Sequence, residues 1–142
     1  MTWATRAAWL ALSAYADFWA DQELCEGTSP DVDAEIAACT RQIGSGHFWG
    51  HDLAIEYYNR GIAWKAKGDL DRAIADYTKA ILLDPANANN FNSRCWCRAL
   101  DGKDLNGALG DCNESLRLRP NDGNTLNSVQ LKVGAFDAAI AD

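Results

Sequence analysis

The amino-acid sequence predicts an all-α fold in which antiparallel helical hairpins stack side by side. Three observations lead to this prediction. Apolar residues recur at steps of three and four through residues 54–83, which is the period of an amphipathic helix. A turn at Lys67-Gly68-Asp69 divides this stretch into two runs, and the same two-part pattern returns downstream. Because one hairpin cannot bury its apolar faces alone, the recurrence favours a stacked array.

The first hairpin covers residues 54–87, and each of its helices has an apolar face. The first helix carries two adjoining faces, one of Ile55, Tyr58, Ile62 and Lys65 and one of Tyr57, Gly61 and Trp64. The apolar positions of the second helix are Leu70, Ala73, Ile74, Tyr77, Ala80 and Ile81. Gly68 can adopt the positive φ that ends a helix. Pro85 ends the second helix, because proline disfavours α geometry at the residue before it.

These residues resemble the tetratricopeptide repeat, a family of helical hairpin repeats. The resemblance rests on a co-spaced series of large, small and aromatic positions: Tyr57, Gly61, Trp64, Ala73, Tyr77, Ala80 and Pro85. It implies that small residues such as Gly61 and Ala73 let the two helices approach closely. It also implies a short right-handed solenoid of hairpins, which is the fold we expect.

A second copy of the pattern covers residues 88–121. Its matching positions are Phe91, Cys95, Ala108, Cys112, Ser115 and Pro120. Pro85 and Pro120 are 35 residues apart (120 − 85), one more than the usual spacing of about 34, so we expect an extra residue in the turn at residues 101–103. Arg98 and Cys112 replace the two aromatic residues of the family pattern.

Weaker copies flank the two hairpins. Residues 134–142 repeat residues 68–76 and end in the same Ala-Ile-Ala-Asp, although the preceding helix is three residues shorter than its counterpart. Residues 36–43 resemble residues 74–81 and predict the second helix of a leading repeat. The predicted organisation is a signal peptide or N-terminal helix (1–20), a cysteine-bearing leading segment (21–53), two repeats (54–87 and 88–121) and a shortened third repeat (122–142).

The N-terminal residues have the layout of a secretory signal peptide. A single basic residue, Arg6, precedes the apolar run Ala7 to Tyr15, and Ala14-Tyr15-Ala16 fits a small-x-small cleavage site. We expect cleavage after Ala16 or after Ala20, export to a bacterial periplasm or secretion, and no membrane association once the signal is removed. The alternative is a cytoplasmic protein whose first helix packs on the repeats through its tryptophans, namely Trp3, Trp9 and Trp19.

The cysteines predict two disulfides within hairpins. Cys39 and Cys112 occupy equivalent places on second helices, and each has a cysteine on the preceding helix, which gives the pairs Cys25–Cys39 and Cys95–Cys112. Disulfides persist in oxidising compartments, so these pairs and the export prediction support each other. The alternative is five reduced thiols that pack as small apolar groups. Cys97 matches Ala63 and is expected to be a buried filler, although an unpaired thiol could also join two copies of the chain.

Residues 44–52 predict a surface loop before the first full repeat. We expect Phe48 and Trp49 to fold back on the core and Asp52 to cap the next helix. His47 and His51 could form a zinc set with Cys25 and Cys39, but glycines interrupt the stretch and the cysteine spacing is far wider than in zinc knuckles. We therefore predict no metal site.

Charge and motifs narrow the classes of function. The net charge of −7 argues against nucleic acid, whose phosphates require clustered Lys and Arg. The chain has no Gly-rich phosphate loop, no Gly-x-Ser-x-Gly and no His-Glu-x-x-His. We expect no enzyme activity and no cofactor.

The resemblance implies an interaction module that binds a peptide or partner helix in a concave groove. In this sequence the groove positions are Tyr58, Ile62, Lys65, Asn89, Asn92 and Trp96. Asn59 matches one residue of the carboxylate clamp with which some members hold chaperone tails, but Ile62 and Trp96 stand where polar partners are needed, so we do not expect a chaperone-tail binder. The alternative function is self-assembly, in which the truncated third repeat buries its open face against a second copy as a homodimer.

Overall fold

The computed structural model describes residues 3–27 and 29–120, and every regular element in these ranges is an α-helix. The predicted all-α class is therefore confirmed. The helices are α1 (Trp3–Cys25), α2 (Val32–Gly44), α3 (Gly50–Lys67), α4 (Leu70–Leu83), α5 (Ala88–Asp101) and α6 (Leu105–Leu118). None of the helices in these ranges is both long and apolar enough to cross a bilayer. The predicted third repeat at residues 122–142, with its open face, lies outside the described residues.

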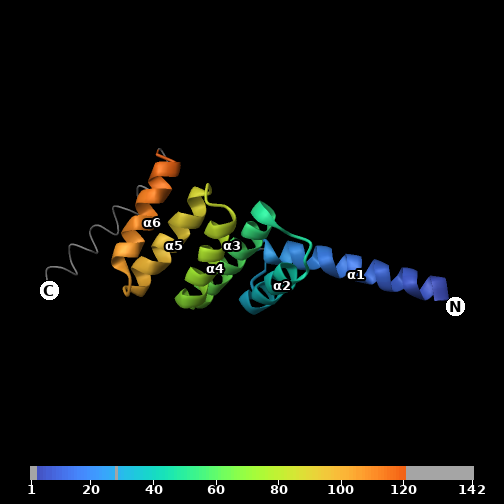
Figure 1. Cartoon of the computed structure of the whole chain (residues 1–142). Helices are drawn as coiled ribbons and strands as arrows, with labels where there is room; N and C mark the ends of the chain where they lie inside the picture. Colours follow the sequence, from blue (N-terminus) through green and yellow to red (C-terminus); the bar gives the residue numbers. More distant parts are fainter. Residues whose placement is uncertain (1–2, 28, 121–142) are drawn as a thin grey trace.

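Consecutive helices pair as hairpins, and the hairpins stack in chain order (Figure 1). Helices α1 and α2 form the leading hairpin, α3 and α4 form the first full repeat, and α5 and α6 form the second. Between hairpins, α2 packs on α3 and α4 packs on α5. Residues 36–43 thus lie in α2, the second helix of this leading hairpin, whose first helix, α1, crosses the predicted boundary between residues 20 and 21.

The turns inside the hairpins follow the predicted glycines. Gly68 ends α3 with a φ of 86°, and Asp69 then accepts a hydrogen bond from the backbone N–H of Arg72 at the start of α4. In the second repeat Gly102 ends α5 with a φ of 72°. One residue, Lys103, then precedes the capping residue Asp104. Lys103 is the predicted extra residue of this repeat.

The start of α3 differs from the prediction. The helix begins at Gly50, so Asp52 lies inside its first turn and is not the cap. The carboxylate of Asp52 is still favourable there, because the N-terminal end of a helix carries partial positive charge. Phe48 stacks on Phe18 of α1 at a centroid distance of 5.9 Å. Trp49 is 75% exposed, so the expectation that it folds back on the core is wrong.

In the first repeat, α3 packs tightly against Tyr77 of α4 at Gly61. A Cβ atom built on Gly61 would lie 2.8 Å from Cε1 of Tyr77, a residue with no exposed surface. Cys97 of α5 is also fully buried and belongs to the same core cluster as Ala73 and Tyr77. The predicted role of Cys97 as a small filler is therefore confirmed.

Helix α1 packs on the array only near its C-terminal end and projects away from it at the other (Figure 1). Its contacts there include the ring of Phe18, the carbonyl of Phe18, which accepts from Nε2 of Gln42 at 2.7 Å, Asp21, which pairs with Arg41 at 2.6 Å, and Cys25, which is bonded to Cys39. Residues 11–17 are exposed, and Trp19 is 50% exposed. Trp19 is thus not a buried knob, and the side chains of Trp3 and Trp9 lie outside the described part.

Candidate functional site

The predicted groove residues of α3 form a partly open apolar stripe. Ile55 and Ile62 are 39% and 37% exposed, although both are β-branched apolar residues. Tyr58 lies between them and is half-buried, with its ring 5.6 Å from that of Tyr77. Lys65, at the end of the stripe, is half-buried. Ile55 was not among the predicted groove residues, but it lies on the same face and is as exposed as Ile62.

The predicted groove residues of α5 are mainly polar. Asn89 is exposed and accepts a hydrogen bond from Nη1 of Arg119 at 3.1 Å, so its carbonyl is engaged. Asn92 and Trp96 are half-buried. The side-chain oxygen of Asn92 is buried without a hydrogen-bond partner. The hydroxyl of Ser93 donates to the Tyr58 hydroxyl at 3.4 Å, which places this face of α5 beside that of α3.

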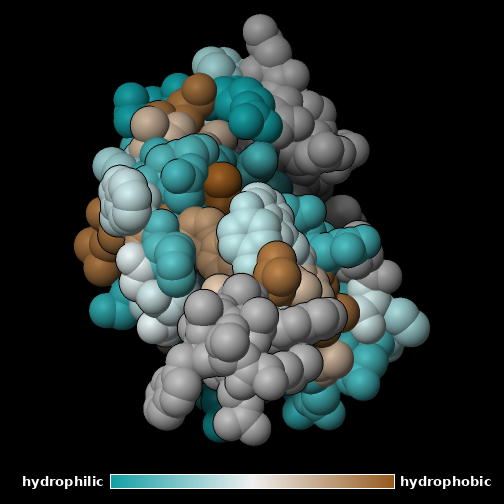
Figure 2. All heavy atoms as spheres, turned by 90° about the vertical axis from the view of Figure 1, so that its right-hand side faces the viewer, coloured by the Kyte–Doolittle hydropathy of each residue, from teal (hydrophilic) through white to brown (hydrophobic). Residues whose placement is uncertain are grey.

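Two surface depressions lie away from this face, at the turns between helices. The first is lined by Pro30, Asp31, Val32, Asp33 and Lys67. The second is lined by Lys67, Gly68, Asp69, Leu70, Asp71 and Asp101. Figure 2, which looks at the side from which α1 projects, shows hydrophilic residues with smaller apolar groups between them. The charged residues that line the two depressions are mostly acidic, which agrees with a net negative charge located on solvent-exposed surface.

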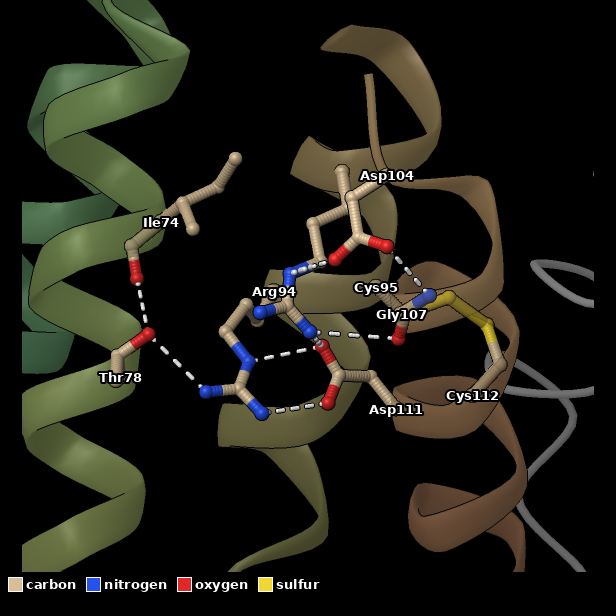
Figure 3. A network of polar contacts seen from close by, with 9 residues as sticks. Ile74, Thr78, Arg94, Cys95, Asp104, Gly107, Asp111 and Cys112 are labelled. Atoms are coloured by element: carbon tan, nitrogen blue, oxygen red, sulfur yellow. Dashed lines mark hydrogen bonds and ion pairs between the residues drawn. A yellow bond between two sulfur atoms is a disulfide. The ribbon is translucent and has the colours of Figure 1, made fainter. Parts of the chain in front are cut away.

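A buried polar network joins the two full repeats, and the sequence reasoning did not find it. The guanidinium of Arg94 on α5 donates to both carboxylate oxygens of Asp111 on α6, at 2.8 and 2.6 Å. Its third contact is the hydroxyl of Thr78 on α4, at 3.0 Å. Figure 3 shows Arg94 lying between Thr78 and Asp111. One side chain thus ties the helices of its own repeat to the repeat before it.

Arg98 extends this network. Its Nη1 donates to Asp111 at 2.8 Å and to the carbonyl of Gly107 at 3.4 Å. Arg98 stands where the family pattern has an aromatic residue, and in this repeat an ion pair occupies the place of an aromatic contact. Asp111 is only 5% exposed, so two guanidinium groups neutralise one buried carboxylate.

The same arrangement recurs one repeat earlier. Arg60 donates to both oxygens of Asp76, at 2.7 and 2.8 Å, and to the hydroxyl of Thr40 at 3.1 Å. Thr40 belongs to α2, so the leading hairpin is tied to the first repeat as the first is tied to the second. The detectable signal in the sequence is the recurrence of an Arg followed 16 or 17 residues later by an Asp.

The structure joins Cys25 to Cys39 and Cys95 to Cys112 by disulfides, with Cα–Cα distances of 4.8 and 5.4 Å. These are the two pairs that the sequence predicts. Cys97 is not in a disulfide and is buried. Each disulfide connects the two helices of one hairpin.

A buried carboxyl group lies against the first disulfide. Oε2 of Glu56 on α3 is 3.0 Å from Sγ of Cys25, and Glu56 is only 5% exposed. Burial, followed by the nearby charges of Glu26 and Asp52, raises the pKa of Glu56 to about 7. Sequence reasoning missed this residue, because a single Glu in an amphipathic helix gives no sign that it is buried.

The two histidines do not meet. The ring of His47 lies 5.1 Å from that of Phe18, and Nδ1 of His51 lies 2.7 Å from Oδ2 of Asp84. The cysteines of the hypothetical zinc set are joined to each other. Among the described residues, no group of three or more His, Cys, Asp or Glu is placed to hold a metal ion.

Comparison with known proteins agrees with this architecture. The model of the tetratricopeptide repeat family matches residues 54–87. The chain is 33% identical to tetratricopeptide repeat protein 36 of Caenorhabditis elegans over 63% of its own length and 49% of the relative's. It is 27% identical to stress-induced-phosphoprotein 1 of the same organism over 70% of its own length and 32% of the relative's. The chain thus spans about half of the first protein and about a third of the second.

Two solved structures share the fold. The first repeat domain of Spaghetti (RPAP3), bound to an HSP90 peptide, matches with a TM-score of 0.66 and 20% identity, covering 75% of this chain and 80% of that domain. The second repeat domain of human RPAP3, in complex with an HSP70 peptide, matches with a TM-score of 0.71 and 24% identity, covering 83% and 96%. Residues 54–87 thus match the tetratricopeptide repeat family, and the helices around them have the fold of tetratricopeptide repeat domains.

Proposed function

We propose that the chain is a protein-interaction module that binds an extended peptide or a partner helix across the inner face of α3 and α5. The observation that carries this proposal is the stripe of Ile55, Tyr58 and Ile62. Isolated exposed apolar residues are common on protein surfaces, but here two exposed isoleucines flank a tyrosine on one helical face. Other positions of α3 are buried, among them Ala54, Gly61 and Ala63.

The structural neighbours support a peptide as the partner, since both are complexes with chaperone peptides. The partner proposed here has a different chemistry. The basic clamp that the family uses for acidic chaperone tails is not matched in this sequence. The face offers isoleucine, tyrosine, tryptophan and asparagine side chains, with the cation Lys65 at one end and Arg119 bound to Asn89. We therefore propose that the partner is a weakly apolar peptide whose backbone forms hydrogen bonds with the asparagine side chains of the groove.

The test is selection from a random peptide library on the immobilised chain, followed by affinity measurement of the enriched peptides. Ile62→Glu places a charge in the middle of the stripe and should weaken binding by at least about tenfold, since about 1.4 kcal/mol corresponds to one factor of ten. Leu82→Glu is the matched control, because Leu82 is 72% exposed on α4. Equal affinity for the native chain and Ile62→Glu would place the binding site elsewhere.

We also propose that the chain is exported, with cleavage after Ala16. The recorded packing of α1 begins at Phe18, so cleavage after Ala16 leaves these contacts in place, whereas cleavage after Ala20 would remove the Phe18–Phe48 stacking. Intact mass of protein expressed with its own N-terminus, alkylated without reductant under denaturing conditions, tests this. The expected product lacks 16 residues and carries one alkyl group on Cys97. A full-length product with five alkyl groups would contradict both export and the disulfides.

A further inference from the structure

The first disulfide and Glu56 form a buried cluster at the junction between the leading hairpin and the first repeat. Glu56 belongs to α3, Cys25 to α1 and Cys39 to α2. Cys25 is 2% exposed and Cys39 has no exposed surface. The carboxyl oxygen of Glu56 approaches Sγ of Cys25 to 3.0 Å. Three helices therefore meet at a sulfur–carboxyl contact that the groove does not use.

The redox state of Cys25 decides which of the two groups donates the hydrogen bond. A sulfur atom in a disulfide carries no hydrogen, so a hydrogen bond at this distance requires the proton to be on Glu56. Neutral Glu56 donates to Cys25, whereas an ionised carboxylate would face the lone pairs of the sulfur. After reduction the relation is reversed, because the Cys25 thiol can donate to an ionised Glu56. The oxidised form thus favours the acid and the reduced form favours the carboxylate.

The charged groups around Glu56 do not compensate an ionised carboxylate in the oxidised form. Glu26, after α1, and Asp52, on α3 itself, both repel it. On α2, Glu35 accepts from the backbone N–H of Ser29. Arg60, one turn further along α3, is held by Asp76 of α4 and Thr40 of α2. The site is acidic, and its nearest arginine is engaged elsewhere.

We propose that Cys25–Cys39 and Glu56 form a redox site for a dithiol reductant, in which reduction of the disulfide is coupled to loss of the Glu56 proton. Because both sulfurs are buried, exchange requires local opening of this junction. A thiolate of the reductant then attacks Sγ of Cys39, the S–S bond breaks, and the electron pair remains on Sγ of Cys25. The second thiolate of the reductant then forms its own disulfide and releases Cys39. The two protons of the dithiol pass to Cys25 and Cys39, the dithiol becomes a disulfide, and the carboxyl proton of Glu56 enters the solvent.

The second disulfide provides an internal reference. The carboxylate beside Cys112 in the sequence is Asp111, which is paired with Arg94 and Arg98. Both oxygens of Asp111 accept hydrogen bonds from these guanidinium groups, and none of these bonds involves a sulfur atom. Reduction of Cys95–Cys112 is therefore not coupled to a carboxyl proton in this way.

The experiment measures the equilibrium constant for exchange with dithiothreitol, separately for each disulfide, from about pH 5.5 to about pH 8 on the full chain. Differential alkylation followed by peptide mass spectrometry reports both sites in one sample. Net release of one proton makes the constant for Cys25–Cys39 rise with pH by about tenfold for each unit by which reduction lowers the pKa of Glu56. The constant for Cys95–Cys112 should stay within about twofold below the ordinary thiol pKa. A flat profile at Cys25–Cys39 would overturn the proposal.

Two variants assign the effect to Glu56. In Glu56→Gln the profile at Cys25–Cys39 should become as flat as that of the reference disulfide, and persistence of the slope would reject Glu56 as the source of the proton. Glu26→Gln changes an exposed side chain and removes the larger of the two repelling charges. The midpoint of the pH profile for Cys25–Cys39 should move to lower pH. The substitution does not alter either cysteine. An unmoved midpoint in a folded Glu26→Gln protein would also overturn the proposal.

Discussion

Gly61 of α3 faces Tyr77 of α4, and the ring of Tyr77 occupies the space that a side chain at this position would need. The distance from an added Cβ to the ring is 2.8 Å, and Tyr77 is fully buried among Ala73, Cys97 and their neighbours. The tyrosine cannot turn outward without opening the core. The family preference for a small residue at this position thus has a direct physical reason in this chain.

Gly61→Ala should lower the free energy of unfolding by about 1–3 kcal/mol through overpacking. The gain in helix propensity, about 1 kcal/mol, offsets only part of this loss. Gly110→Ala on α6 is the matched control, because a Cβ there meets nothing within 4 Å. The control should be neutral or slightly stabilising in urea unfolding. Equal effects of the two substitutions would show that the Tyr77 ring adapts.

Glu56 should make stability depend on pH. Its pKa is raised to about 7 in the folded chain from an ordinary value near 4.5. Between these values the folded state holds a proton that the unfolded state has lost, so the free energy of unfolding falls as pH rises. The total is about 3 kcal/mol, at about 1.4 kcal/mol for each pKa unit. Above about pH 8, where Glu56 is ionised in both states, this contribution no longer changes.

Glu56→Gln cannot ionise and should remove that decline. Under oxidising conditions the variant should match the native chain near pH 4 and exceed its stability near pH 8, as measured by urea unfolding at both values. Its amide can still donate to Cys25, so the packing is preserved. A variant that is less stable than the native chain at pH 8 would contradict the raised pKa.

At the scale of the helices, the repeated Arg–Asp–Thr contact is the connection between hairpins. Arg94 and Arg60 each bind an Asp of their own repeat and a Thr of the repeat before. Thr78 and Thr40 in turn donate to carbonyls of their own helices, at Ile74 and Ile36. Each junction therefore combines apolar packing with a hydrogen bond from Arg to Thr, and the bidentate ion pair within the repeat orients the Arg that makes it.

Asp111→Ala should destabilise the chain by about 3–5 kcal/mol, because it leaves Arg94 and Arg98 partly buried without their carboxylate. Asp71→Ala is the control. It removes the exposed partner of Lys103, at 3.3 Å, and should cost less than about 1 kcal/mol. Chemical unfolding of both variants measures the difference. Similar losses would mean that water or another acceptor replaces Asp111.

At the scale of the whole molecule, the two disulfides stabilise the first and the last hairpin of the described array. Cys25–Cys39 closes a separation of 14 residues in the leading hairpin, and Cys95–Cys112 closes 17 residues in the second repeat. The first full repeat, between them, has no disulfide and relies on Tyr77, Trp64 and the apolar residues around them.

Full reduction should lower the free energy of unfolding by roughly 3 kcal/mol for each disulfide, because loops of this length lose their constraint in the unfolded chain. Urea unfolding with and without a reductant measures the loss, and alkylation confirms the number of free thiols. Cys95→Ala with Cys112→Ala isolates the second disulfide. An unchanged midpoint after verified reduction would show that the helices hold without the bonds.

Much of the architecture could be predicted from the sequence, because it depends on local rules. The period of apolar residues gives the helices, Gly68 and Gly102 end them, and the extra residue of the second repeat falls at Lys103. The start of α3 was predicted less well, because Asp52 is acceptable both as a cap and within the first turn. The sequence could predict which residue types lie on the groove face. It could not predict that Ile55 is exposed or that Arg119 donates a hydrogen bond to Asn89.

The sequence by itself determined the hairpins, their turns and the cysteine pairs, because each of these follows from spacing along one or two helices. Only the tertiary structure decided which polar residues are buried and what they face. Glu56 meets Cys25 from 31 residues away, and Arg94 reaches Thr78 in another repeat. The charge state of such groups depends on how completely neighbouring helices exclude water from them, and that is a property of the packed array.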